Sequence, residues 1–292
     1  MKNVILILLL TIFSMININA SNYVSESYLK KDMGYDWVSV SLKDIDSYNA
    51  KISIKSRADR KKPTCTFDDI VSKSLDNEFI SYKNGKKIIF SLKNDILSIK
   101  GKNIEDENIL YYFCSGGASL KGEYKRLYEP LDKKQIDKRN YVNTLSYNQY
   151  MFFIEESDNT MSIFSPNLKY LNKPILKKIE GEIIYSEIAD INSDGNPEIY
   201  IYTNSLRNKK NYAKVIVFSV NNGVSLSEIY LESLSENKKA FENFEGNDEF
   251  RVVENSLVRR FPIKENKTKQ IQYKLIPGEA SWQLKVDKIL EY

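Results

Sequence analysis

Alternation of apolar and polar residues recurs along much of the chain. In residues 35–57 and 78–101, apolar side chains occupy nearly every second position. This period favours half-buried β-strands, because successive side chains of a strand point to opposite faces. Asn84-Gly85 predicts a type I′ hairpin turn, whose two central residues need positive φ. We therefore predict a three-strand meander over 78–101, then another strand within 108–124 that ends in a glycine-rich loop.

The same pattern returns in the second half of the chain. The segments "EIYIYTN" (198–204) and "KVIVFSV" (214–220) predict strands separated by the polar stretch "SLRNKKNY". Residues 249–263 and 270–290 predict two further hairpins, the second turning at Pro277-Gly278.

These patterns predict an all-β protein made of two antiparallel β domains. Residues 128–145 are polar, charged and weakly patterned, which marks a linker. Residues 21–127 are expected to form a small barrel or sandwich, and residues 146–292 a β-sandwich with little helix.

The N-terminus predicts the compartment. Lys2 precedes the apolar run Val4–Phe13, and the stretch up to the small residue Ala20 suits a cleavage site. Residues 1–20 therefore resemble a secretory signal peptide, which implies a periplasmic protein. The alternative is a membrane anchor, for which the run is short against the roughly 20 residues needed to span a bilayer. No later segment is long and apolar enough to insert into a membrane after cleavage.

Composition limits the available chemistry. The two cysteines, Cys65 and Cys114, are expected to pair in an oxidising compartment, the alternative being two separate buried thiols. The sequence contains no histidine, which excludes histidine-based triads and zinc sites. Its 43 basic and 39 acidic residues are interspersed, a weak footprint for nucleic acid. We expect neither an enzyme nor a nucleic-acid binder.

One loop carries metal-ligand spacing. In "DINSDGNPE", oxygen-bearing side chains recur at Asp190, Asn192, Asp194 and Glu198, with Gly195 at the turn. Such spacing suits Ca²⁺, although Ile201 stands where an EF-hand has its bidentate glutamate. The alternative is an Asx-type turn, in which the same side chains cap the backbone. Apart from this calcium site, no cofactor is expected.

The C-terminal third resembles a known family. The segments that carry the resemblance are "ADINSDGNPEIYIYTNS", "SLSEIYL", "DEFRVVENSLVRRFPI" and "QYKLIPGEASWQLKVDKILEY". Together they span roughly residues 185–292 and are similar to bacterial periplasmic inhibitors of invertebrate-type lysozyme. The resemblance implies a β-sandwich whose loop, bearing serine, glycine and tyrosine, plugs the lysozyme cleft. It also implies a role in evading host defence.

Carried onto this chain, the inhibitory loop corresponds to "SLRNKKNY". Ser205 and Tyr212 match the serine or tyrosine of the family, whereas Arg207, Lys209 and Lys210 stand in the region of its glycines. Since lysozymes cut glycosidic bonds with acidic residues, a cationic loop could bind them by charge-assisted hydrogen bonds. The alternative is a solvated hairpin tip.

A second loop is faintly similar to the Ser-Gly and Tyr signature of c-type lysozyme inhibitors, which are also small secreted β-barrels. The residues that carry it are Ser115, Gly116, Ser119, Gly122 and Tyr124. The alternatives are an anion cradle of backbone N–H groups and a bent strand end beside a disulfide.

The expected function is therefore a periplasmic inhibitor that occludes a lysozyme, of invertebrate type first. The rival hypotheses are a calcium-binding cell-envelope adhesion or scaffold module and a carboxylate-based cell-wall glycosidase, for which no pair of acids can be placed. A homodimer stays open.

Overall fold

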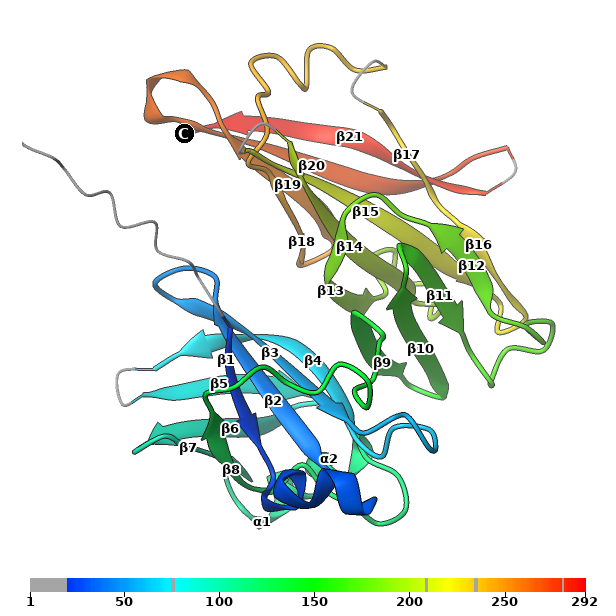
Figure 1. Ribbon diagram of the computed structural model, residues 1–292. Coiled ribbons are helices and arrows are strands. Elements are labelled where there is room, and N and C mark those ends of the chain that lie inside the picture. The colour runs from blue at the N-terminus through cyan, green and yellow to red at the C-terminus, as the bar shows by residue number, and fades with distance from the viewer. Residues whose placement is uncertain (1–19, 75–76, 208–209, 234–235, 280) are drawn as a thin grey trace, which may run out of the picture.

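The protein folds into a β-barrel followed by a stack of β-sheets (Figure 1). The structure, a computed structural model, describes residues 20–74, 77–207, 210–233, 236–279 and 281–292. The predicted all-β class with two antiparallel parts is confirmed, and one short parallel pairing joins Tyr230 and Leu231 to Gln283 and Leu284. The predicted signal peptide lies outside the described residues except for Ala20. Within the described ranges, no helix combines the length and apolar character needed to cross a membrane.

The first part is a closed barrel of eight antiparallel strands in sequence order. Strand β1 pairs with both β2 and β8 and so closes the barrel. It begins at Ser21, directly after the predicted cleavage site, so cleavage there would leave the closing strand whole. The strands are β1 (Ser21–Val24), β2 (Val38–Asp44), β3 (Asn49–Ser56), β4 (Thr66–Lys73), β5 (Glu78–Lys83), β6 (Lys86–Lys93), β7 (Ile96–Gly101) and β8 (Gly122–Leu127).

Short helices and the disulfide lie between the barrel strands. The 3₁₀ helix η1 (Glu26–Met33) follows β1, and α1 (Ile104–Glu107) and α2 (Ile109–Tyr112) follow β7. The strand predicted to start near residue 108 is therefore wrong there. The apolar run instead forms α2, which buries Ile109 and Leu110 in the barrel core. Cys114 follows α2 and pairs with Cys65, as predicted.

The second part contains three sheets. The first is β9 (Tyr141–Tyr147), β10 (Tyr150–Ser157), β11 (Thr160–Phe164) and β12 (Ile175–Lys178). The second is β13 (Glu182–Ala189), β14 (Glu198–Arg207), β15 (Lys210–Asn221) and β16 (Ser225–Glu228). The third is β17 (Tyr230–Leu231), β18 (Glu249–Val253), β19 (Ser256–Pro262), β20 (Thr268–Pro277) and β21 (Trp282–Glu291), with the 3₁₀ helix η2 (Lys264–Asn266) between β19 and β20.

Strand β14 lies in the middle of this stack and is buried on both faces. Ile199 and Ile201 pack in the core shared with the β9–β12 sheet. Tyr200 and Tyr202 point the other way, into the core shared with the β17–β21 sheet. Two-sided burial explains why "EIYIY" is almost continuously apolar rather than alternating.

The predicted linker is shorter than expected and packs on the barrel. Strand β9 already begins at Tyr141, inside the range 128–145. The alternation of apolar and polar residues in β9 is weak because the polar Asn143 occupies a position on its buried face. Asn143 donates to Ser186 Oγ there at 2.9 Å. Before it, Gln135 accepts a 2.9 Å hydrogen bond from Trp37 of the barrel. The segment therefore fastens the two parts together.

A buried carboxylate also joins the two parts. Asp68 of β4 is 3% exposed and accepts a 3.0 Å hydrogen bond from the Val142 N–H of β9. Its other oxygen, Oδ1, is buried without a hydrogen-bond partner in the described residues. This burial raises the pKa of Asp68 to about 6.

Removing the disulfide should destabilise the barrel. Replacing Cys65 and Cys114 together by alanine frees a loop with a sequence separation of 49 in the unfolded chain. We expect the free energy of unfolding to fall by about 4 kcal/mol. Trp37 is buried beside the barrel core, in a small cluster with Val24 of β1 and Tyr28. In a Trp282→Phe background it would be the single tryptophan, so its fluorescence in urea reports this part. An unchanged urea midpoint would contradict the prediction.

Asp68→Asn should change how stability depends on pH. A raised folded-state pKa means that the proton is bound more tightly in the folded state. The stability that protonated Asp68 contributes to the folded state is thus fully present below its ordinary pKa of 3.8. This stability is lost as pH rises through the folded-state pKa of about 6. We expect the variant to gain roughly 2 kcal/mol relative to the native chain between pH 4 and 7.5, measured by urea denaturation. The exposed Asp158→Asn is the control, and curves parallel to the native one for Asp68→Asn would refute the idea.

Candidate functional site

The hairpin predicted as a lysozyme-binding loop is formed by the ends of β14 and β15. The register pairs Ser205 with Tyr212 and Arg207 with Lys210. Ser205 Oγ lies 3.4 Å from the Tyr212 carbonyl oxygen. The structure therefore brings together four of the five predicted residues, while Lys209 lies outside the described residues.

The cations of this hairpin are paired within the protein. Arg207 and Lys214 both donate to the Glu180 carboxylate at 2.7 Å, and Lys210 donates to Glu245 at 2.7 Å. These partners hold the pKa values of Glu180 and Glu245 below their usual range. All of these side chains remain substantially exposed, so the pairs are weak and exchangeable.

The second strand of the hairpin rests on a neighbouring segment. Tyr212 packs edge-on against Phe244, with ring centroids 6.0 Å apart. Asn211 donates its N–H to Asn247 Oδ1 at 3.0 Å, and Ala213 donates to Asp248 Oδ1 at 2.9 Å. Tyr212 is thus partly a structural residue, and the segment 244–248 keeps the hairpin in one position.

On the other side of the hairpin, Gly181 lies close to the backbone of the first strand. Gly181, which precedes β13, has a φ of 80° and lies against the Asn204 carbonyl group. A Cβ at this position would overlap that carbonyl, so only glycine allows the approach. The approach brings Glu180, next in sequence, within reach of Arg207 and Lys214.

Leu206 is a candidate contact residue that the sequence analysis did not identify. Its side chain is 73% exposed, between Ser205 and Arg207 and across from Asn211. The signal was present in the sequence, because Leu206 is the one aliphatic residue of the polar stretch "SLRNKKNY". An exposed leucine contributes favourable free energy when an apolar surface of a partner buries it.

The loop with metal-ligand spacing adopts the geometry of an Asx-type turn. Asp190 accepts the N–H groups of Asp194 and Gly195 at 3.1 and 2.8 Å, and Asp194 accepts that of Asn196 at 2.7 Å. In the described part of the chain, no group of three or more histidine, cysteine, aspartate or glutamate residues is placed to hold a metal ion. The oxygen donors suit Ca²⁺ by type, but here they are occupied by backbone N–H groups.

Glu198 is the unusual acid of this loop. It is fully buried and accepts the Ile191 N–H at 3.1 Å, with the Ser219 hydroxyl 3.5 Å from its other oxygen. Burial raises the pKa of Glu198 to about 8, and the nearby Asp190 and Asp194 add to the shift. Any cation bound beside it would have to displace a proton.

The second predicted loop divides between surface and core. Ser115 and Gly116 are exposed beside the disulfide, and the Ser119 hydroxyl accepts the Lys121 N–H at 3.1 Å. Tyr124 is 4% exposed and donates to the Leu120 carbonyl at 2.9 Å. Its burial raises its pKa to about 12. Gly122 begins β8. A partner could touch Ser115 and Gly116, but Tyr124 belongs to the barrel core.

Comparison with models of protein families finds none that matches this chain, and comparison with curated proteins finds no match.

Proposed function

We propose that the protein is a periplasmic inhibitor that binds a lysozyme and occludes its active-site cleft with the β14–β15 hairpin. The observation that carries the proposal is the combination of an exposed Leu206 with a fixed backbone. The backbone is buttressed by Glu180–Gly181 on one side and by residues 244–248 on the other. A hairpin held in its bound shape loses little conformational entropy on association, so more of its contact energy appears as affinity.

Specificity for an acidic cleft would come from an exchange of ion-pair partners, in which the hairpin cations leave their own glutamates for acids of the lysozyme. Arg207 and Lys210 are held by exposed glutamates, in pairs that typically contribute only about 0–1 kcal/mol. A catalytic carboxylate in a desolvated cleft is a stronger partner for the same cations. Glu180 and Glu245 would then turn away from the acidic partner into solvent. The described cations at the tip, including Lys214, exceed these two acids by one.

The hairpin would inhibit in two ways at once. It fills the cleft that the glycan needs, and it places a cation beside the acidic residues. A glycosidase needs one carboxylic acid to be protonated near neutral pH, and a nearby cation lowers that pKa. The protein itself performs no chemistry in this mechanism, in keeping with a binder rather than an enzyme.

Leu206→Asp should weaken inhibition at least tenfold. The change removes an apolar contact worth about 1.5–3 kcal/mol when buried and adds a negative charge facing acids. The measurement is lysis of a bacterial suspension by invertebrate-type, c-type and goose-type lysozymes over a range of inhibitor concentrations. Leu176→Asp is the matched control, because Leu176 is 68% exposed on β12. Undiminished lysis with the native protein for every lysozyme type would remove the proposal.

Two further variants separate the polar contacts of the tip from a general loss of fold. Charge reversal at Arg207 and Lys210 should weaken inhibition strongly, because each new carboxylate would face both its former partner and the acidic cleft. Ser205→Ala should weaken it only modestly, since one hydroxyl is lost. Full inhibition by all of these variants, with unchanged melting temperatures, would place the binding surface elsewhere.

The alternative function, a calcium-binding cell-envelope module, is favoured by one observation, the buried Glu198 beside Asp190 and Asp194. It predicts a melting temperature that rises with millimolar CaCl₂ and falls again with chelator. Because a proton must leave Glu198, the rise should be larger at pH 8.5 than at pH 6.5, and Glu198→Gln should abolish it. A melting temperature indifferent to calcium at both pH values would dispose of this alternative.

A further inference from the structure

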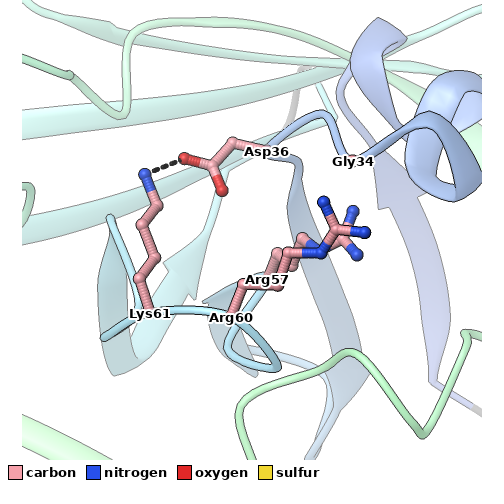
Figure 2. A pocket seen from close by; sticks show the side chains of 5 residues that line it. All are labelled: Gly34, Asp36, Arg57, Arg60 and Lys61. Carbon is pink, nitrogen blue, oxygen red and sulfur yellow. Dashed lines mark ion pairs between the residues drawn. The ribbon is translucent and has the colours of Figure 1, made fainter.

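A cationic pocket lies at the barrel, distant in sequence from the lysozyme-binding hairpin. It has a volume of about 340 Å³ and is lined by Gly34, Asp36, Arg57, Arg60 and Lys61. Figure 2 shows the guanidinium groups of Arg57 and Arg60 directed toward Gly34, while Lys61 reaches Asp36. Two loops form the pocket, one after η1 and one between β3 and β4.

Two of the three lining cations already have partners. Arg57 is 3% exposed, donates to Asp59 Oδ2 at 2.9 Å, and also donates to the carbonyl oxygens of Lys31 and Tyr35 at 2.6 and 3.1 Å. Lys61 forms an ion pair with Asp36. The Arg57 guanidinium is therefore a fixed wall of the pocket rather than a free ligand.

Arg60 is the lining cation whose charge is left over. Its side chain makes no hydrogen bond or ion pair with any residue in the described ranges, although it points into the pocket. Gly34 makes room for it, because a Cβ on Gly34, whose φ is 90°, would overlap Arg60 Nη1. The backbone is thus shaped so that an unpaired guanidinium lies against it.

The surrounding charge favours an anion. The two loops together carry six basic residues against three acidic ones over residues 30–36 and 57–62. Most of this surplus lies outside the pocket lining, where it adds a longer-range attraction to the unpaired charge of Arg60. A phosphate dianion gains more from that attraction than a carboxylate does, and guanidinium groups bind phosphate oxygens in a bidentate manner. We propose that this pocket binds a phosphate group, with Arg60 as its principal ligand.

The phosphate could be free in solution or belong to a lipid headgroup. Met33, next to Gly34, is 75% exposed, and Leu29 of η1 is 77% exposed, so an apolar surface adjoins the pocket. Free phosphate and a lipid phosphomonoester present the same terminal oxygens and a similar charge to Arg60, and binding to vesicles distinguishes them.

The test compares the native protein lacking the signal peptide with Arg60→Gln and Lys62→Gln. The two variants lose the same charge from the same loop, but Lys62 does not line the pocket. Binding of inorganic phosphate is followed by NMR titration at constant ionic strength, with acetate as the second anion. We expect Arg60→Gln to lose about tenfold in phosphate affinity and Lys62→Gln to lose little. Equal losses in both variants, no binding by the native protein, or equal affinity for acetate would overturn the proposal.

A third variant and a membrane probe complete the test. Gly34→Ala keeps every charge but displaces Arg60, so it should lose phosphate affinity while its barrel still melts cooperatively. Retained affinity in this variant would count against the proposed ligand geometry. Sedimentation with vesicles that contain phosphatidic acid, whose headgroup is a phosphomonoester, then identifies the source. Vesicle binding lost in Arg60→Gln assigns a lipid headgroup, whereas phosphate binding without vesicle binding assigns a soluble phosphate.

Discussion

The two-sided burial of β14 is the constraint on which the second part of the molecule depends. Its isoleucines fill one core and its tyrosines the other, so this strand of the middle sheet packs against both of the other sheets. A slip of one residue in its register would exchange the two sets and disturb both cores together. The strand also emerges from the stack at Ser205, where burial ends and the exposed tip begins. The described residues at the start of the tip, Leu206 and Arg207, therefore continue directly from a strand that is buried on both faces.

The strands were predictable because their cause is local. Alternation, the turn Asn84-Gly85 and an almost continuous apolar run all leave their mark within a few residues, and two cysteines in an oxidising compartment indicate a disulfide. The failures have tertiary causes. The run near Ile109 is equally suitable for a strand or a buried helix, and its place at the end of the barrel decides for helix. Strand β9 escaped notice because a buried Asn143 replaces an apolar residue and is satisfied by Ser186, which is 43 residues away.

The candidate site shows the same division between local and distant causes. The hairpin and its polar residues were predicted from the sequence. Leu206 could also have been predicted as a contact residue, because it is the one aliphatic residue of the stretch. The contacts of these residues could not be predicted, because Glu180 and Glu245 come from loops on either side of the hairpin. The need for glycine at Gly181 likewise arises only because the strand that contains Asn204 passes close to it. The structural role of Tyr212 could not be predicted for the same reason, because its contact with Phe244 is made only in the folded chain.

The two cationic surfaces of the protein differ in a way that bears on how each would bind. At the hairpin, every described cation has a flexible carboxylate partner on the surface, so binding there is an exchange of weak pairs and depends on a partner that offers stronger ones. At the barrel pocket, Arg57 is fixed by its own hydrogen bonds and Arg60 is left unpaired within the described residues. An anion entering that pocket breaks no existing pair of Arg60. Selectivity should therefore come from the partner's acids at the hairpin and from the shape around Gly34 at the barrel.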